Sequence, residues 1–356
     1  MKKGLIKWIK TGKLRYLIIS TITMIVVLSG SSIGRMSEKV QTKKIKDAFQ
    51  TYQDLSNIVK IILPYSYMRW VVSAIIIFIW ILIIYFRLFY EETIQKPKEI
   101  IHILAHSSLG KTQFKLNEEA SKTVQLTLED LDLIEDVKVM KENYSMLQYI
   151  VTKQDSFIEK FKDKINNTDK YGYMGISHTP FILRAGYKIG DETKFVMIHK
   201  KRNVDYYEKL NNCETYPPIE IERKNLKENC TELIVAISTT FPIEDNQLNI
   251  LQPENKSVLK FKSEKLGFDV ITSEKQVEDY VSNILGVIRQ IRGDKGITKI
   301  HMVISSSVVF TFALGQALSS NYDPEIIIYN FDINNPKKYP WGISLFKDSM
   351  NCVVVN

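Results

Sequence analysis

The sequence has few of the residues on which most catalytic and metal sites depend. Its 356 residues include only three cysteines and five histidines. Cys213, Cys230 and Cys352 form neither a CxxC pair nor a disulfide framework. No GxxxxGK[ST] phosphate loop occurs, and no Ser/His/Asp grouping has a recognisable spacing. We therefore expect no catalytic residues, no metal and no cofactor, and a reducing compartment for the C-terminal part.

An excess of positive charge is also lacking over most of the chain, although the net charge is +8. Residues 1–100 hold 16 Lys and Arg against 6 Asp and Glu, whereas residues 101–356 hold 32 against 34. A domain that binds a polyanion without specificity needs a net basic face. We therefore expect no nucleic-acid polymer as a partner of the larger, C-terminal part.

The N-terminal part contains two long apolar runs. Residues 16–34 and 70–86 carry no charge, and an arginine flanks each run on both sides. As helices they would extend roughly 25–29 Å, close to the thickness of the hydrocarbon core of a bilayer. We predict a membrane part over residues 1–98 with two transmembrane helices, although a signal peptide is the alternative for the first run. Apolar residues spaced by three and four within the connecting loop, residues 35–68, predict an amphipathic helix on the membrane surface or against a neighbouring subunit.

Charge counting does not assign the two sides of the membrane. Six Lys and Arg precede the first run, and the 35–68 loop also holds six. Two spans return the chain to its starting side, so both termini are expected in one compartment. Gly30 and Gly34 form a GxxxG pattern, which lets membrane helices approach closely and hints at self-association.

Residues 172–202 are the most informative stretch of the C-terminal part. An apolar strand ends at Ile176 and is followed by a polar corner of Ser177, His178 and Thr179. Pro180 suits the first turn of a helix, where its missing N–H would have no partner. Gly186 lies inside that helix, where glycine costs about 1 kcal/mol relative to alanine. Close packing of the helix on a sheet is the expected reason for it.

The same design returns at residues 300–332. An offset of 129 residues sets Gly186 on Gly315, Ser177 on Ser306 and the following apolar strands on each other without a gap. We interpret this as an internal repeat of a strand–helix–strand unit. The alternative is that all doubly wound α/β units look similar.

Further elements surround the two repeats. Residues 99–105 and 232–237 predict buried strands, each followed by a polar corner, and alternation at 126–133 predicts an edge strand or a turn. Apolar residues at spacings of three and four from 133 to 165 predict one long amphipathic helix, packed on a sheet or in a coiled coil. A second helix is expected over 277–291, with Gly293 as its stop.

Four apolar strands therefore end in clusters of Ser, Thr and His. Open α/β sheets bind ligands at the carboxyl ends of their strands, so two repeats would surround one pocket with these corners. A ligand with several phosphates and approximate internal symmetry would fit, with nearby cations and an aromatic side chain that stacks on a base. The alternative is that the corners only cap helices and the cations are solvated. The candidate ligand-binding residues are Ser107, Ser108, Ser177, His178, Thr179, Arg184, Lys200, Arg202, Ser238, Thr239, Ser305, Ser306, Ser307 and Trp341.

These residues resemble a known family. The runs YGYMGISHTPFILRAGYKIGDETKFVMIHKKR, IHMVISSSVVFTFALGQAL and EIIIYNFD…YPWGISL are similar to the SAVED domain, the cyclic-oligonucleotide sensor of CBASS antiphage effectors. The resemblance covers roughly residues 99–356. It implies an α/β fold of two fused CARF-like, Rossmann-like units, at about 99–235 and 236–356. With the two preceding transmembrane helices, the chain resembles the two-transmembrane type of SAVED effector. The family often has a tryptophan after its first basic strand, where this chain has Tyr206 and Tyr207.

The resemblance implies a receptor rather than an enzyme. A partner CD-NTase would make a cyclic di- or trinucleotide, which binds the SAVED domain and assembles a homo-oligomer. The membrane helices would then disrupt the inner membrane and kill the infected cell. This implies a multi-pass inner-membrane protein, with the SAVED domain and both termini cytoplasmic. Two alternatives remain: a membrane-bound α/β enzyme acting on a nucleotide or lipid-linked substrate, and a passive membrane-anchored sensor that recruits another effector.

Overall fold

The computed structural model describes residues 71, 74, 75, 77–82, 85, 98–140, 143–166 and 168–355. The chain divides into two compact units, residues 1–96 and 97–356. The predicted span 16–34 and the 35–68 loop lie outside the described residues, and those residues of the predicted span 70–86 that are described are helical. In the part of the chain that is described, no helix combines the length and the apolar character needed to cross a bilayer.

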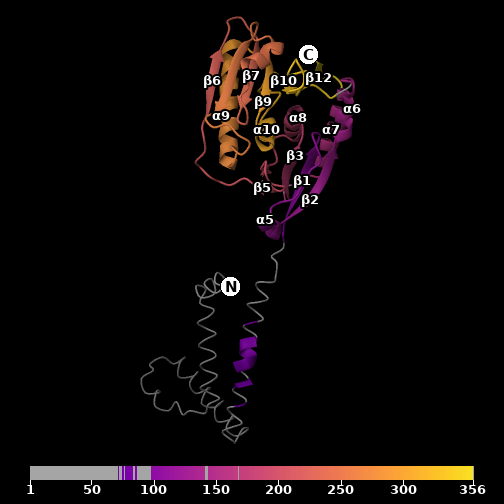
Figure 1. Ribbon diagram of the computed structural model, residues 1–356, viewed down its shortest axis with the longest axis vertical. Helices are drawn as coiled ribbons and strands as arrows, with labels where there is room; N and C mark the ends of the chain where they lie inside the picture. The colour runs from indigo at the N-terminus through magenta and orange to yellow at the C-terminus, as the bar shows by residue number, and fades with distance from the viewer. Residues whose placement is uncertain are drawn as a thin grey trace, which may run out of the picture. The chain divides into compact units, whose positions relative to one another are not determined.

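The second unit contains two sheets, of which the first has five strands in the order β2-β1-β3-β4-β5 (Figure 1). The first four strands are parallel, and β5 pairs antiparallel with β4. β2 lies at the edge of this sheet, so of the two predictions for residues 126–133 the edge strand is confirmed. The strands are β1 (Glu99–Ser107), β2 (Val124–Asp132), β3 (Lys170–Ile176), β4 (Phe195–Lys200) and β5 (Tyr207–Lys209).

The second sheet has seven strands in the order β12-β11-β10-β9-β7-β8-β6. Its segment β8-β7-β9-β10-β11 repeats the order and the strand directions of the whole first sheet. The predicted internal repeat is therefore confirmed, and it extends over five strands of each sheet. The strands are β6 (Ile219–Asn225), β7 (Glu232–Ser238), β8 (Ser257–Ser263), β9 (Lys299–Ser305), β10 (Glu325–Asn330), β11 (Trp341–Ser344) and β12 (Val353–Val355).

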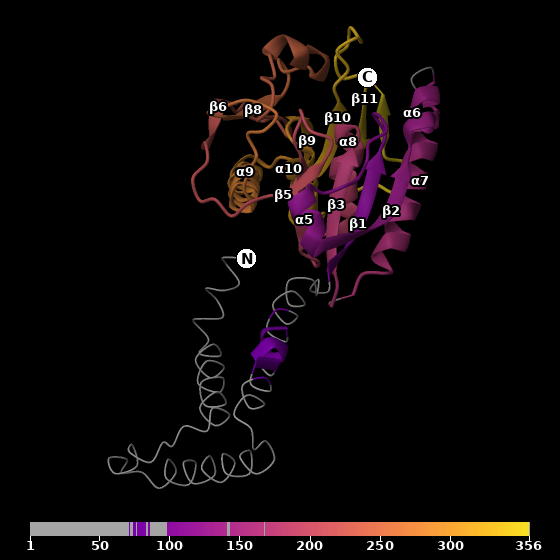
Figure 2. The ribbon, with the colours of Figure 1, turned by 60° about the horizontal axis from the view of Figure 1, so that its bottom comes forward.

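Helices from each repeat cover one face of their own sheet and meet those of the other repeat. α7 and α8 pack on the first sheet, α9 and α10 pack on the second, and α8 lies beside α10 between the sheets (Figures 1 and 2). The fold is thus mixed α/β, with two sheets whose helices pack against each other. The helices are α5 (Glu118–Thr123), α6 (Ile134–Met140), α7 (Met146–Lys162), α8 (Thr179–Ile189), the 3-10 helix η2 (Asp245–Leu251), α9 (Glu274–Lys295) and α10 (Val308–Gln316).

The two repeat glycines pack against each other, not against a sheet as predicted. A Cβ atom added to Gly186 on α8 would lie 2.2 Å from the backbone oxygen of Phe312 on α10. A Cβ added to Gly315 would lie 2.2 Å from the backbone oxygen of Leu183 on α8. Each glycine therefore leaves room for the backbone of the other repeat's helix. The prediction of close packing is confirmed, but the predicted partner, a sheet, is wrong, because the glycine packs against a helix.

Three sequence-based boundaries need correction. The long helix predicted over 133–165 is two helices, α6 and α7, because the Asn143 side chain accepts the N–H of Ser145 in a turn between them. α9 continues through Gly293 and ends at Lys295, followed by Gly296 with a φ of 65°. The boundary predicted at 235/236 falls inside β7. Since β6 already belongs to the second sheet, the boundary between the two repeats lies between β5 and β6.

Candidate functional site

The first polar corner lies where β1 and β3 end and α8 begins. Ser108 Oγ lies 2.6 Å from Ser177 Oγ and 2.7 Å from His178 Nδ1, and it accepts the His178 N–H at 2.9 Å. Ser107 and these three residues are all buried. The corner is therefore a closed hydrogen-bond cluster, in which the side chains satisfy one another.

The second corner lies where β7 and β9 end and α10 begins. Thr239 Oγ1 and Ser306 Oγ are 2.7 Å apart. Ser238 Oγ accepts the N–H of Ile243, and Ser305 Oγ accepts the N–H of Phe241. Ser307 caps α10 by accepting the N–H of Phe310. Ser305 and Ser306 are half-buried, whereas the other three predicted residues of this corner are buried.

Backbone contacts show that the two corners are equivalent. The N–H groups of Ser108 and Leu109 both donate to the oxygen of Ile176, at 3.0 and 3.1 Å. Those of Thr239 and Thr240 both donate to the oxygen of Ser305, at 2.8 and 2.9 Å. Residues 176 and 305 differ by the 129 positions of the repeat. The polar corners predicted from sequence are therefore related by the same internal symmetry as the helices.

A tryptophan of the second repeat, opposite the last residue of β10, contacts the first corner. The ring centroids of His178 and Trp341 are 6.1 Å apart, and those of Phe181 and Trp341 are 5.5 Å apart. The carboxyl edge of the first sheet therefore meets the carboxyl edge of the second. Only 2% of Trp341 is exposed, so it has no free face on which a base could stack. The structure gives it a packing role instead of the predicted ligand contact.

Arg184 is likewise a structural residue. It is 0% exposed, and its guanidinium donates to both carboxylate oxygens of Asp155 on α7, at 2.9 and 2.6 Å. It also donates to the backbone oxygens of Ser344, Leu345 and Lys347, which follow or end β11. All its donor groups are directed into the protein, so the prediction that Arg184 contacts a ligand is wrong. Arg184 instead forms a clamp between α7, α8 and the second sheet.

Lys200 and Arg202 lie at and just beyond the end of β4 and remain accessible. The Lys200 ammonium donates to Thr112 Oγ1 at 3.3 Å, and the side chain is half-buried. Arg202 is exposed, and the carbon of its guanidinium lies 3.7 Å from the ring centroid of Phe268. Thr179 is half-buried at the start of α8. The predicted residues that a ligand can reach are therefore Thr179, Lys200, Arg202, Ser305 and Ser306.

Two exposed aromatic residues beside this edge were missed by the sequence analysis. Phe241 is 54% exposed and Phe268 is 37% exposed, and their rings meet edge to face with centroids 4.9 Å apart. Phe241 follows the second polar corner directly, which is the sequence signal that would have found it. Phe268 lies in a loop without periodicity, and nothing in its local sequence marks it.

A buried histidine extends the first corner into the core. His106 Nδ1 lies 2.8 Å from the Tyr173 hydroxyl, and His106 Nε2 lies 3.2 Å from Ser177 Oγ. Burial, with a smaller contribution from nearby His178, lowers the pKa of His106 to about 3. Burial also raises the pKa of Tyr173 well above its usual range. His106 is therefore neutral at physiological pH and acts as a structural hydrogen-bonding group.

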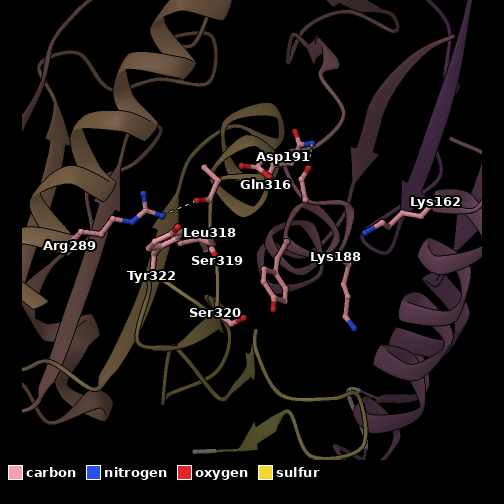
Figure 3. Close-up of a pocket in the computed structure, with 12 residues that line it drawn as sticks. Lys162, Lys188, Asp191, Arg289, Gln316, Leu318, Ser319, Ser320 and Tyr322 are labelled. Carbon is pink, nitrogen blue, oxygen red and sulfur yellow. Dashed lines mark hydrogen bonds between the residues drawn. The ribbon is translucent and has the colours of Figure 1, made fainter. Parts of the chain in front are cut away.

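A cavity of about 600 Å³ opens at the C-terminal ends of α8 and α10, whereas the polar corners lie at the N-terminal ends of these helices (Figure 3). Lys162, Lys188 and Arg289 contribute cations to its wall. Lys188 lies 3.3 Å from Asp155, and Arg289 forms a bidentate pair with Asp323, so both charges are already compensated. None of the predicted site residues lines this cavity. Among the described residues, no cluster of three metal-ligating side chains occurs there or elsewhere.

Comparisons with known proteins agree with this architecture. The family model "SAVED: SMODS-associated and fused to various effectors sensor domain" matches residues 154–345. No curated protein matches the chain.

Three of the similar solved structures come from two bacteria. The Acinetobacter baumannii Cap4 SAVED/CARF-domain containing receptor with the cyclic trinucleotide 2'3'3'-cAAA has 13% identity and a TM-score of 0.47, over 84% of this chain and 61% of that one. The same receptor with 3'3'3'-cAAA has 16% identity and a TM-score of 0.45, over 65% and 50%. The Moraxella osloensis Cap4 receptor has 15% identity and a TM-score of 0.43, over 70% and 51%. The chain spans at most about three fifths of these proteins. By the match of the family model over more than half of its length, the chain belongs to the SAVED family of sensor domains.

Proposed function

We propose that this chain is a receptor for a cyclic oligonucleotide in CBASS antiphage defence, and not an enzyme. The observation that carries the proposal is the pair of equivalent corners, Ser108–Ser177 and Thr239–Ser306, at the meeting carboxyl edges of two repeated sheets. Ligands of open α/β sheets bind at this edge. A ligand whose phosphates repeat around a ring matches a site whose protein groups also repeat. Membership of a sensor family supports the same conclusion.

The ligand contacts at this edge come from the accessible groups. Thr179 and Ser306 stand at the starts of α8 and α10, where helix N-termini favour anions. Lys200 and Arg202 add positive charge from the end of β4. The buried residues of both corners hold these groups in position and do not touch the ligand themselves. A cyclic di- or trinucleotide made by a partner CD-NTase is the proposed ligand.

The effector activity belongs to residues 1–98. We assign residues 16–34 and 70–86 as transmembrane helices, with the sensor and both termini in the cytoplasm, where the ligand is made. The described part of 70–86 is helical and exposes the large apolar side chains Val71, Ile75, Phe78, Ile79 and Ile81. Exposed apolar surface of this kind suits contact with lipid or with another copy of the helix. Ligand binding would assemble the sensors into a homo-oligomer, and the gathered helices would disrupt the inner membrane.

The proposal is tested with the full-length protein in detergent and in dye-filled liposomes. Cyclic di-AMP, cyclic di-GMP and 3'3'3'-cAAA are added in turn, the last because it occupies a solved SAVED/CARF receptor. A ligand present at about 100 times its Kd stabilises the folded state by about 2.7 kcal/mol. We expect one compound to raise the melting temperature, increase the sedimentation coefficient and release the dye.

Each departure from this result has its own meaning. Stabilisation and assembly without dye release would favour a passive sensor that recruits another effector. No response to any compound would contradict the receptor function. Arg202→Met should weaken the response, whereas Lys295→Met, at the far end of α9 and exposed, serves as the matched control.

The runner-up function is a membrane-bound enzyme acting on a nucleotide or lipid-linked substrate. The one observation in its favour is the 2.7 Å contact between Ser108 Oγ and His178 Nδ1, since a serine activated by histidine is a common nucleophile. Both residues are buried, which favours the receptor. Chromatography of each compound after a long incubation with the protein distinguishes the enzyme from the receptor. Turnover of a compound that is abolished in His178→Ala would support the enzyme.

A further inference from the structure

The two repeats match in their strands and helices but differ at the rim of the carboxyl edge. By the backbone contacts described above, Thr239 corresponds to Ser108, Thr240 to Leu109, and Phe241 therefore to Gly110. The first repeat thus has a glycine where the second carries an exposed aromatic ring. The internal symmetry of the candidate site is broken at this position.

The connection that precedes the long helix of each repeat adds to this difference. In the first repeat, residues 133–145 separate β2 from α7, and they include the short helix α6. In the second repeat, residues 264–273 separate the equivalent strand β8 from α9, the equivalent of α7, and they form a loop without a helix. Phe268 lies in this loop, and the backbone contact from Gly267 N–H to the oxygen of Thr239, at 3.0 Å, fixes the loop against the second corner. This loop therefore brings a second aromatic ring to the side of Phe241.

The third component comes from the other repeat. Arg202 follows β4 of the first sheet, and its guanidinium covers one face of the Phe268 ring at 3.7 Å. By the register of β4 on β3 and of β10 on β9, the residue at the equivalent position of the second repeat is Ile333. Among the described residues, no carboxylate lies within ion-pair distance of Arg202, and the neighbouring Asp269 contacts His199 at 3.5 Å. The positive charge of Arg202 is therefore not compensated within this surface.

A cation stacked on an exposed aromatic pair suits one part of a nucleotide in particular. A nucleobase offers a flat π-face to Phe241, Phe268 or the guanidinium plane, and stacking on aromatic side chains contributes about 1–3 kcal/mol per base. The phosphate attached to that base can meet the guanidinium, whose N–H groups suit phosphate oxygens. A ligand recognised through phosphates alone would leave two exposed phenylalanines without a use.

We infer that Phe241, Phe268 and Arg202 form a platform that stacks one nucleobase of the cyclic oligonucleotide. Because the first repeat has no equivalent platform, the site is asymmetric although its scaffold is symmetric. Each chain then binds one ligand molecule in a single orientation, with one base held differently from the others. This inference rests on the proposed receptor function and specifies how that site recognises its ligand.

The test uses the full-length protein in nanodiscs and a 3'3'3'-cAAA in which one adenine is replaced by 2-aminopurine, whose fluorescence is quenched on stacking. Cyclic di-AMP and cyclic di-GMP are titrated in parallel by calorimetry. For a compound that binds, we expect one molecule per chain and an affinity loss of at least 10-fold in Phe268→Ala and in Phe241→Ala. Phe268→Tyr should bind within 3-fold of the unaltered protein. Quenching of 2-aminopurine should disappear in Phe268→Ala.

The matched control is Leu109→Ala. Leu109 is 59% exposed and stands at the rim of the first repeat, where the symmetry places Thr240 in the second. Its removal should change the affinity less than 2-fold, and all variants should melt within about 2 °C of the unaltered protein, because the altered side chains are exposed. Unchanged binding in both alanine variants of the platform would overturn the platform and leave the receptor function standing. Failure of all three compounds to bind the unaltered protein would overturn the receptor function itself.

Discussion

Gly186 and Gly315 meet where α8 crosses α10, with their Cα atoms so close that a Cβ on either would lie 3.1 Å from the Cα of the other. The same added atom would lie 2.2 Å from a backbone oxygen of the facing helix. Real Cβ contacts of this length do not occur, so only glycine permits the approach. This contact joins equivalent positions of the two repeats and lets α8 and α10 cross at close range.

Alanine at either glycine should therefore destabilise the fold. In Gly186→Ala the methyl group meets backbone, which has no rotamer to yield, so α8 and α10 must separate. Overpacking of this kind costs about 1–3 kcal/mol and occasionally more, and we expect at least about 3 kcal/mol for each variant. Urea unfolding followed by circular dichroism measures the change.

Gly286 on α9 provides the matched control for the glycine variants. It is exposed, and a Cβ added there would meet no atom within 4 Å. Gly286→Ala should stabilise the protein by about 0.5–1 kcal/mol, because alanine has the higher helix propensity. The double variant Gly186→Ala/Gly315→Ala should cost less than the sum of the single variants, since the first already separates the helices. Full additivity would argue against a shared contact.

The clamp formed by Arg184 predicts a second stability effect. Arg184→Met leaves the buried carboxylate of Asp155 with only the half-buried Lys188, 3.3 Å away. Removing one partner of a buried ion pair costs about 3–5 kcal/mol, and three backbone oxygens at and just after the end of β11 would lose their donor. Lys188→Met, which removes the other cation from the same carboxylate, should cost less than about 1 kcal/mol. Equal losses in the two variants would show that Arg184 has no special role.

Much of the sensor fold follows from local sequence. The polar residues at 106–108, 177–179, 238–240 and 305–307 do end four parallel strands, because apolar runs that stop at Ser or Thr mark where a buried strand reaches the sheet edge. The repeat offset of 129 also relates Ile176 and Ser305, whose backbone oxygens accept the equivalent hydrogen bonds of the two corners. These features are either local or repeated along the chain, and both kinds can be recognised in a single sequence.

Other features depend on contacts between distant segments and could not be inferred. The spacing around Gly186 indicates a close approach but not its partner, which lies 129 residues away. Arg184 has the residue type of a phosphate ligand, and only the fold shows Asp155 beside it. Phe268 is an exposed ring in an irregular loop, so no periodicity identifies it, and its pairing with Phe241 and Arg202 joins three separate segments.

The two corners, although equivalent in backbone, should respond differently to loss of a hydroxyl. Ser108→Ala removes the acceptor of the His178 N–H and the partner of two further buried atoms. Leaving buried polar groups without partners costs about 1–3 kcal/mol. Thr239→Val preserves the shape and removes one contact, to the half-buried Ser306, so we expect a loss of less than about 1 kcal/mol. Thermal unfolding of the two variants under one buffer condition compares them, and a larger loss for Thr239→Val would contradict the difference.

The buried His106 predicts that stability depends on pH in a defined direction. Its pKa is about 3 in the folded protein, where burial keeps the ring neutral, and about 6.5 in the unfolded chain. The unfolded state therefore binds a proton between these values that the folded state does not, so stability is complete above about pH 7.5 and falls as the pH drops below 6.5. One such group contributes a slope of about 1.4 kcal/mol per pH unit. Burial also lowers the pKa of His199 and His301, which adds to the slope in the same direction.

Replacing His106 by Gln, which keeps polar atoms near Tyr173 and Ser177, should remove about 1.4 kcal/mol per pH unit from the slope measured by urea unfolding between pH 6 and pH 4.5. An unchanged slope in this variant would mean that His106 is not the neutral buried group described here.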